Sequence, residues 1–377
     1  MKIQTFMEGI HQLGISFYTG VPDSYLKALC DFLMSEYGVG NHHIVAANEG
    51  ASVALAAGHF LSTGNPALVY MQNSGIGNAV NPICSLVHKK VYDIPVLFVI
   101  GWRGEPGTKD EPQHIFQGEI TQSLLNILEI QHSLISPDTS PDEFHKDIDK
   151  AQKALNQGSC YAFLIRKDSL ENDFKNVYQN SLSISREQAL MEVISQSLPD
   201  DIFVSTTGKL SRELFEIRES LQEGHSKDFL TVGSMGHSSM IALEIARNKP
   251  CKTVFCLDGD GAVLMHMGSL AIIGSHGPEN YIHILINNGA HETVGGIPTV
   301  SQQMDYLGLA SACGYPIVRK AEDQRQLSEI LKEIRILKGP VFIEIDTNLI
   351  SRPDLGRPTT STIENKQAFM DTLKEKQ

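Results

Sequence analysis

Two turns in the second half of the chain carry residue types that can bind a metal ion and a phosphate group. The segment Thr253–Leu257 is expected to form a strand that runs into Asp258-Gly259-Asp260-Gly261. A second expected strand, Tyr281–Ile286, runs into Asn287-Asn288-Gly289-Ala290, and twenty-five residues separate Gly261 from Asn287. In a parallel sheet both turns lie at the carboxyl ends of their strands, where open α/β folds bind ligands.

The oxygen atoms at these turns suit magnesium. Asp260 offers a hard carboxylate, Asn288 offers a side-chain oxygen, and Ala290 can offer a backbone carbonyl. Two oxygens of a diphosphate and one water would complete the octahedron of oxygens that Mg²⁺ requires. The sequence therefore predicts a metal site formed by Asp260, Asn288 and Ala290.

The glycines beside Asp260 favour a diphosphate as the second ligand. Gly259 and Gly261 permit a close approach of the backbone, and a helix beginning near Ala262 would direct free N–H groups at phosphate oxygens. Either turn alone is better explained as an ordinary Asp-Gly or Asn-Gly turn. Because both follow strands and occur at this spacing, together they favour a diphosphate–magnesium site.

The elements that must position these turns follow an alternating pattern. Short runs rich in Val, Ile, Phe and Tyr alternate with helix-like stretches, which is typical of a mostly parallel α/β sheet. We expect an α/β protein with two similarly built, doubly wound, mostly parallel-sheet domains, residues 1–168 and 185–377, joined by a polar linker at 169–184. The expected strands are 15–18, 44–47, 67–71, 95–100, 161–165, 202–205, 253–257, 281–286 and 341–345, and the expected helices are 49–63, 238–247, 262–275 and 326–337.

Composition limits the possible functions. The chain has 377 residues, enough for two domains, and a formal net charge of -13, which disfavours binding to nucleic acid or to an anionic membrane. The N-terminus lacks a signal-peptide core, and the most apolar run, Ile94–Gly101, is too short to span a bilayer. The cysteines form no Cys-x-x-Cys pair, so we expect reduced thiols in a cytoplasmic protein; they are Cys30, Cys84, Cys160, Cys251, Cys256 and Cys313.

The motif Gly259-Asp260-Gly261, followed at this spacing by Asn287-Asn288, resembles the cofactor motif of the thiamine-diphosphate-dependent enzymes. That resemblance implies thiamine diphosphate and Mg²⁺ as cofactors, with residues 1–168 binding the pyrimidine and residues 185–377 binding the diphosphate and the metal. The cofactor-binding residues that it implies are Glu49, Gly208, Gly233, Met235, Gly259, Asp260, Gly261, Ala262 and Asn288.

By the same resemblance, Glu49 would be the glutamate that hydrogen-bonds N1′ of the aminopyrimidine and thereby promotes loss of the C2 proton to give the ylid. Its position at the start of an Ala/Gly-rich helix fits this role. A glutamate that only interacts favourably with the helix dipole would occupy the same position. In Val232–His237, Met235 would support the bent cofactor, and the Gly233 carbonyl would accept from the 4′-amino group. Methionine is more often core filler.

The length leaves no room for the middle domain of the larger decarboxylases and synthases of this family. The chain is instead similar to the phosphonopyruvate decarboxylases and their close relatives, the sulfopyruvate decarboxylases. The resemblance implies decarboxylation of 3-phosphonopyruvate to phosphonoacetaldehyde and CO₂ in phosphonate biosynthesis, with sulfopyruvate as the alternative substrate. The segments that carry it are Tyr18–Ser24, Gly101–Gly107, Asp110–His114, Thr206–Glu213 and Asn287–Glu292.

An anionic 2-keto acid needs cations and proton donors. Asp23 and His114 are candidates for proton handling, although Asp23 could equally be a helix N-cap. His291 and Glu292 follow the metal loop, and Glu292 receives no role. Each candidate cation could also be a solvated surface charge; the candidate substrate-binding residues are Arg103, Lys109, Gln113, Lys209, Arg212 and His291. The related decarboxylases often have aspartate where this chain has Gly289, so Ala290 is a metal ligand by position only.

Other classes fit less well. A dinucleotide-binding oxidoreductase needs Gly-x-Gly-x-x-Gly after a strand, and Ser74–Gly77 lacks the third glycine. Gly208-Lys209 is no Walker loop, because Phe203 stands where a glycine is required. A carboligating synthase of the same family is a weaker alternative. In this family the active sites usually lie between subunits, so we expect a homodimer or a larger homo-oligomer.

Overall fold

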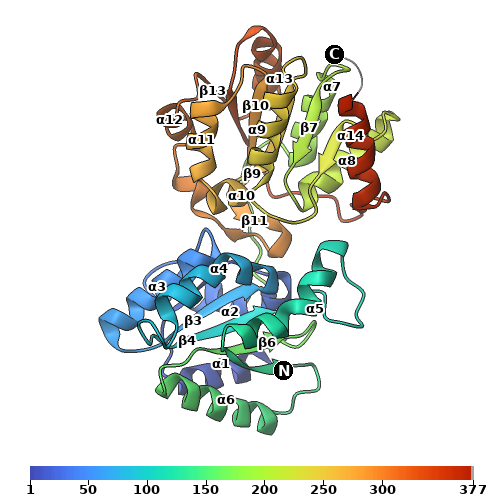
Figure 1. The fold of residues 1–377 in the computed structure, drawn as a ribbon. Helices are drawn as coiled ribbons and strands as arrows, with labels where there is room; N and C mark the ends of the chain where they lie inside the picture. The colour runs from blue at the N-terminus through green and yellow to red at the C-terminus, as the bar shows by residue number, and fades with distance from the viewer. Residues whose placement is uncertain (375–377) are drawn as a thin grey trace. The chain divides into compact units, whose positions relative to one another are not determined.

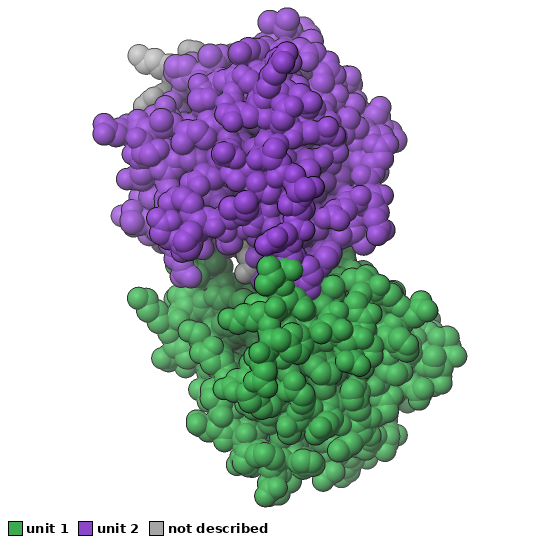
Figure 2. Space-filling view, turned by 180° about the vertical axis from the view of Figure 1, so that it is seen from behind, with its two compact units in different colours: residues 1–177 green, residues 178–377 purple. Residues whose placement is uncertain are grey.

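The protein, described by a computed structural model over residues 1–374, divides into two compact units, Met1–Val177 and Tyr178–Gln377 (Figure 2). The division falls within the polar segment 169–184. Each unit contains its own six-stranded sheet, and every strand pair within the two sheets is parallel (Figure 1).

The first unit orders its strands β2-β1-β3-β4-β6-β5. Its strands are β1 (Tyr18–Gly20), β2 (His43–Val45), β3 (Ala67–Gln72), β4 (Val96–Gly101), β5 (Gln131–Ile135) and β6 (Tyr161–Ile165). Its helices are α1 (Ile3–Gln12), α2 (Lys27–Glu36), α3 (Glu49–Thr63), α4 (Ile76–Pro82), α5 (Pro112–Ile127) and α6 (Pro141–Asn156).

The second unit orders its main sheet β13-β14-β10-β9-β7-β8. The strands are β7 (Ile202–Ser205), β8 (Asp228–Leu230), β9 (Val254–Gly259), β10 (Tyr281–Asn287), β13 (Ile317–Ala321) and β14 (Val341–Asp346), with a small antiparallel pair, β11 (Ala290–His291) and β12 (Ile297–Pro298). The helices are α7 (Arg186–Ser195), α8 (Lys209–Leu221), α9 (Ser238–Asn248), α10 (Asp260–Met265), α11 (Gly268–His276), α12 (Tyr306–Cys313), α13 (Gln324–Glu333) and α14 (Thr362–Lys374).

The two main sheets have the same topology. Counted in chain order within its own sheet, each has the strand sequence 2-1-3-4-6-5. Apolar side chains cover both faces: in β7, Ile202 and Val204 join the core beneath α9 and α11, whereas Phe203 joins the core beneath α7 and α8. The expectation of two similarly built, doubly wound domains with parallel sheets is confirmed.

The structure differs from the predicted elements in several respects. The first strand is Tyr18–Gly20 rather than 15–18, so Thr19 and Gly20 belong to the sheet and not to the turn. The expected helix 262–275 is divided into α10 and α11, because His266 leaves the helical region at φ -133° and ψ 49°. In the two main sheets, the three strands that no prediction included, β5, β8 and β13, lie at sheet edges.

Candidate active site

The candidate residues of the second unit lie where its strand order changes direction. β7 pairs with both β8 and β9, so the chain winds outward from this point in opposite directions. In open α/β sheets the loops that follow the two central strands separate here and leave a crevice for a ligand. The loop Thr206–Gly208 follows β7, and Gly259-Asp260 lies at the carboxyl end of β9.

Asp260 is the first residue of α10 and is 4% exposed. Its Oδ2 accepts a hydrogen bond at 2.5 Å from the hydroxyl of Thr299. Burial raises the pKa of Asp260 to about 6, although the hydrogen bond from Thr299 acts in the opposite direction. A buried carboxylate is suited to binding a hard cation.

Gly261 lies at a point where a side chain would be crowded. A Cβ placed on Gly261 would lie 3.1 Å from Cε of Met235 and 3.2 Å from Cε1 of His291. The glycine therefore lies at the meeting point of the Val232–Gly236 loop and the start of β11. The bare backbone of Gly261 permits a close approach beside Asp260, and α10, a helix of six residues, begins there with free N–H groups.

The asparagine loop lies next to β9, because β10 pairs with β9 along its whole length. Asn288 is 7% exposed, and its Oδ1 accepts from the backbone N–H of Ala290 at 3.1 Å. Gly289 adopts φ +68°, which makes the sharp turn between them. The structure therefore holds the side-chain oxygen of Asn288 and the backbone of Ala290 in a single turn.

Glu292, to which the sequence analysis assigned no role, connects this loop to two cations. Its Oε1 accepts from Nζ of Lys209 at 2.8 Å, its Oε2 accepts from Nδ2 of Asn288 at 3.2 Å, and it also pairs with Arg186. Burial alone would raise the pKa of Glu292, but Arg186 and Lys209 together lower it below its usual value. The carboxyl group is therefore ionised at neutral pH.

The two predicted substrate cations of the second unit are already hydrogen-bonded. Lys209, the first residue of α8, also donates to the hydroxyl of Ser351 at 2.6 Å. Arg212 donates to the carbonyls of Gly356, at 2.5 Å, and Leu355. In this structure both side chains therefore hold the segment after β14 against α8.

Gly208 precedes α8 with φ 96° and ψ -145°, a conformation open essentially to glycine. Met235 and Gly233 are half-buried within the connection between β8 and α9. Next to them, the hydroxyl of Thr207 donates to the carbonyl of Val232 at 2.7 Å.

His291 follows the asparagine loop. Burial lowers the pKa of its imidazole to about 4, so the ring is neutral at pH 7.

In the first unit, Glu49 is the first residue of α3 and is 5% exposed. Asn48 caps the helix by accepting from the N–H of Ala51 at 2.8 Å. The carboxyl group of Glu49 lies against Gly75, where a Cβ would come within 2.5 Å of it, and Oε2 accepts from Nδ2 of Asn78 at 2.8 Å. The glutamate is therefore fixed at the carboxyl end of β2.

Asp23 is 1% exposed and lies at the end of β1, next to Gly101 at the end of β4. Its Oδ2 accepts from the N–H of Tyr25 at 2.9 Å, so the expected capping role is observed, on a short 3₁₀ turn. Its Oδ1 is buried without a hydrogen-bond partner. Burial raises the pKa of Asp23 to about 6.

Arg103 forms a two-point ion pair with Asp110, with distances of 2.8 Å from Nε to Oδ2 and 2.5 Å from a terminal nitrogen to Oδ1. A third donor of Arg103 reaches the hydroxyl of Ser24 at 3.1 Å, and its guanidinium lies 4.8 Å from the centre of the Tyr25 ring. The structure thus brings Arg103 and Asp23 to the same corner of the sheet, with Asp110 neutralising the arginine.

His114 and Gln113 lie in the first turn of α5 and are half-buried, whereas Lys109 is exposed in the preceding loop. Burial, followed by the charge of Arg103, lowers the pKa of His114 to about 4. Oε1 of Gln113 is buried without a hydrogen-bond partner. An uncharged imidazole and an amide oxygen without a hydrogen-bond partner can each form a hydrogen bond with a polar ligand.

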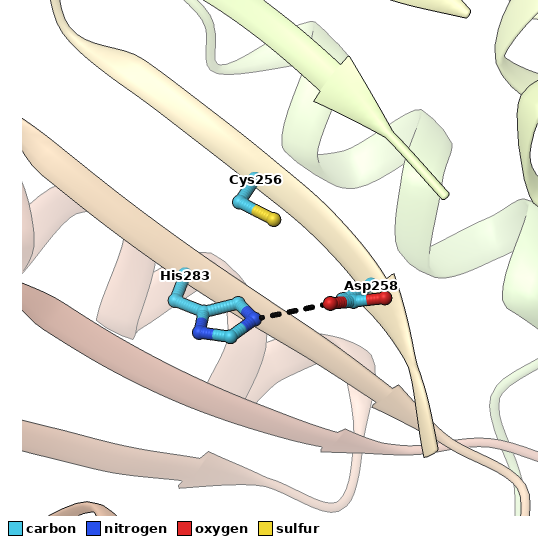
Figure 3. Close-up of side chains that lie close together, drawn as sticks. All are labelled: Cys256, Asp258 and His283. Carbon is cyan, nitrogen blue, oxygen red and sulfur yellow. Dashed lines mark ion pairs between the residues drawn. The ribbon is translucent and has the colours of Figure 1, made fainter. Parts of the chain in front are cut away.

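A further polar cluster, Cys256, Asp258 and His283, lies on one face of β9 and β10 (Figure 3), and its potential ligand atoms lie within 4.8 Å of one another. Nε2 of His283 lies 3.5 Å from Asp258, and its Nδ1 hydrogen-bonds to the hydroxyl of Tyr315 at 3.1 Å. Burial raises the pKa of Cys256 well above its usual value, so its thiol is protonated. Asp258 also accepts from the N–H of Gly259 at 3.1 Å, and the cluster therefore supports the end of β9.

Comparison with known proteins identifies the family of the chain. Residues 3–125 match the thiamine pyrophosphate enzyme N-terminal TPP binding domain, and residues 207–345 match the C-terminal TPP binding domain. The chain is 33% identical over 378 residues, 96% of its length and 92% of the relative's, to phosphonopyruvate decarboxylase from Streptomyces viridochromogenes. The chain belongs to the thiamine pyrophosphate enzyme family.

Two further relatives cover most of the chain. Phosphonopyruvate decarboxylase from Streptomyces hygroscopicus is 32% identical over 98% of this chain and 93% of its own. Sulfopyruvate decarboxylase from Methanosarcina acetivorans is 25% identical over 90% of this chain and 89% of its own. The chain is therefore a thiamine-diphosphate-dependent decarboxylase that acts on a keto acid. Within residues 1–374, no helix is both long and apolar enough to cross a membrane.

Proposed function

We propose that the protein decarboxylates 3-phosphonopyruvate to phosphonoacetaldehyde and CO₂, a step in phosphonate biosynthesis, with thiamine diphosphate and Mg²⁺ as cofactors. The observation that carries the proposal is the similarity to two phosphonopyruvate decarboxylases at 33% and 32% identity over nearly the entire chain. The relative that acts on sulfopyruvate and covers 90% of the chain is less similar, at 25%.

When bound, thiamine diphosphate supplies a carbon nucleophile and takes up the electrons that the departing CO₂ leaves behind. Glu49, fixed at the start of α3, would hold a proton at N1′ of the pyrimidine. Asp23 and His114 would handle the proton that replaces CO₂: His114 is neutral at pH 7 and Asp23 exchanges its proton near pH 6. A donor must lose and regain its proton near the working pH, and Asp23 meets that condition better.

In the second unit, Asp260 and Asn288 with the backbone of Ala290 would hold Mg²⁺. The donors are all oxygens, and the Asp260 carboxylate is buried, so the residues present fit the ion. The residues proposed to hold the cofactor around this site are Gly208, Gly233, Met235, Gly259, Gly261 and Ala262.

The proposal for magnesium is tested by Asp260→Asn. Calorimetric titration of Mg²⁺ in the presence of thiamine diphosphate should show at least a tenfold loss of affinity, since the charged ligand is removed. The matched control is Asp200→Asn, an aspartate whose side chain is 85% exposed, which should bind Mg²⁺ as the wild type does. Unchanged binding in the Asp260 variant would remove Asp260 from the metal site.

The substrate is tested by supplying 3-phosphonopyruvate, sulfopyruvate and pyruvate in parallel to the purified protein with Mg²⁺ and thiamine diphosphate, and following CO₂ release. We expect kcat/KM to be highest for phosphonopyruvate. A higher value for sulfopyruvate would make sulfopyruvate decarboxylase, the second candidate suggested by the Methanosarcina relative, the correct function. Formation of an acyloin from an added aldehyde would indicate a carboligating enzyme instead.

The substrate-binding residues proposed for the anionic keto acid are Arg103, Lys109, Gln113, Lys209, Arg212 and His291. We also propose that residues 1–168 contribute the pyrimidine-binding domain and residues 185–377 the diphosphate- and magnesium-binding domain. The proposal includes a homo-oligomer, a dimer or larger, whose subunits complete each other's active sites. Sedimentation of the active enzyme as a monomer would contradict that assembly.

A further inference from the structure

We propose that Glu292 is a positioning residue that determines which end of the Asn288 side-chain amide faces the magnesium ion. The inference rests on the proposed function, because it concerns the metal site assigned there. It adds to that site a residue that does not itself bind the metal.

The argument begins with the two ends of an amide. The side chain of asparagine carries one oxygen, which can bind Mg²⁺, and one NH₂ group, which cannot. Rotation about the Cβ–Cγ bond exchanges the two ends with almost no change of shape. Asn288 can serve as a ligand only if its surroundings favour the rotamer that directs the oxygen toward the ion.

Glu292 provides that preference. Its Oε2 lies 3.2 Å from Nδ2 of Asn288. An ionised carboxylate can only accept hydrogen bonds, so the amide must present its NH₂ end to Glu292 and its oxygen to the opposite side. On that side Oδ1 accepts from the N–H of Ala290 at 3.1 Å, and a carbonyl oxygen with two lone pairs can still coordinate a metal ion.

The carboxylate is itself fixed. Glu292 has a side-chain exposure of 9%, pairs with Arg186 and accepts from Lys209 at 2.8 Å. Arg186 is in turn held by two hydrogen bonds of 2.6 Å to Glu213. Arg186 is the first residue of α7, and Lys209 is the first residue of α8. Glu292 is therefore fixed by two helices as well as by its own loop.

The neighbouring asparagine supplies an internal comparison. Nδ2 of Asn287 donates at 2.8 Å to Glu344, and Oδ1 of Asn287 accepts from the N–H of Gly289 at 3.1 Å. The two asparagines thus repeat one arrangement, with a carboxylate at the NH₂ end and a backbone N–H two residues ahead at the oxygen end. Only Asn288 is assigned to the metal, so Glu344 is the matched control for Glu292.

The experiment measures metal affinity rather than turnover. Mg²⁺ is titrated by calorimetry in the presence of thiamine diphosphate, and Mn²⁺ by electron paramagnetic resonance, for the wild type, Glu292→Met and Glu344→Met. Methionine keeps the length of the side chain and removes both acceptors. We expect Glu292→Met to weaken Mg²⁺ binding by about tenfold to a hundredfold, as the loss of a group that orients a metal ligand does, and Glu344→Met to change it by less than about twofold.

Two further variants separate orientation from folding and from charge. In a chain that already carries Asn288→Asp, both ends of the side chain are oxygens, so adding Glu292→Met should no longer weaken binding. Glu292→Gln retains one acceptor for Asn288 and should recover much of the affinity. A loss of equal size in the chain with Asn288→Asp, or a Glu292→Gln variant as weak as Glu292→Met, would overturn the proposal.

The outcomes also distinguish this inference from the proposed function. If the wild type binds no Mg²⁺ in the presence of thiamine diphosphate, the proposed metal site fails, and the role of Glu292 fails with it. If the wild type and Glu292→Met bind Mg²⁺ equally well, only the role of Glu292 fails. Circular dichroism of each variant checks that the fold is retained.

Discussion

The side-chain amide of Asn78 donates a hydrogen bond of 2.8 Å to the carboxyl group of Glu49. The same carboxyl group lies over Gly75, so close that a Cβ there would come within 2.5 Å of it. A hydrogen bond from one side and a bare backbone from the other restrict the glutamate to one position. Such fixation is required of a group that must exchange a proton with one particular cofactor atom.

We therefore expect Glu49→Gln to lower kcat by about a hundredfold to ten-thousandfold, the usual contribution of a positioned acid–base group. Binding of thiamine diphosphate, followed by quenching of intrinsic fluorescence, should change only a few-fold, because glutamine has the same shape. Glu8→Gln, an exposed glutamate on α1, is the control and should leave both quantities unchanged. Full turnover in the Glu49 variant would remove this residue from the mechanism.

Asp23 should make stability depend on pH. Its pKa is about 6 in the folded protein, above the ordinary aspartate value of 3.8, so folding favours the protonated carboxyl group. Ionisation in the buried site is therefore unfavourable: the penalty is absent below about pH 4, grows as the pH rises toward 6, and is complete above it. Removing the carboxyl group should thus stabilise the protein at high pH.

Asp23→Asn should consequently be more stable than the wild type at pH 8, by about 2–3 kcal/mol, and this advantage should shrink by about 1 kcal/mol at pH 5. Urea unfolding at the two pH values measures the difference. We also expect the variant to lose most of its turnover, because asparagine cannot donate the proton. If the stability difference between the variant and the wild type were the same at both pH values, the pKa of Asp23 would not be raised in the folded protein.

The Arg103–Asp110 pair predicts a coupling between stability and substrate affinity. The side chains are 16% and 5% exposed, so Arg103→Met would leave a nearly buried carboxylate without its partner. We expect this to destabilise the protein by about 3 kcal/mol, and the added Asp110→Asn to restore a large part of the loss. Thermal or urea unfolding of the two single variants and the double variant measures the coupling.

The same variants test recognition of the substrate. If Arg103 binds the anionic head group, KM for phosphonopyruvate should rise by at least tenfold in Arg103→Met and remain high in the double variant, whose stability is restored. If KM returns to the wild-type value with the stability, Arg103 has only a structural role. A rise of KM in Lys109→Met would then identify the exposed lysine of the same loop as the binding group.

Gly208 should resist substitution. Its φ of 96° and ψ of -145° are unfavourable for any residue with a Cβ, so Gly208→Ala should cost about 1–3 kcal/mol and weaken binding of thiamine diphosphate. Gly58→Ala is the control: it lies inside α3 with open space around its Cβ position, and there alanine should stabilise slightly. Calorimetric unfolding of both variants checks the contrast, and equal stability would contradict the prediction.

The sequence predicted the central strands better than the edges. Strands β6 and β7 match the predicted ranges residue for residue, because each is a short apolar run bounded by turn residues. In the two main sheets, the strands without a prediction, β5, β8 and β13, are edge strands. An edge strand has one neighbour and can carry polar side chains, such as Arg319 and Lys320 in β13, so apolar patterning does not identify it.

For the site, the sequence predicted which residue types follow which strands, as with Asp260 after β9 and Asn288 after β10. It could not predict which charges are neutralised. The partner of Lys209 is Glu292, 83 residues further along the chain, and only the folded structure brings them together. The role of Glu292 went unassigned for the same reason, although its place four residues after Asn288 was visible.

Since each main sheet contains all six of its own strands, the described residues include no strand pair that joins one sheet to the other. A break in the backbone between Val177 and Tyr178 would therefore interrupt no ladder of hydrogen bonds. Two polypeptides encoded by separate genes could carry the same folds as this single chain.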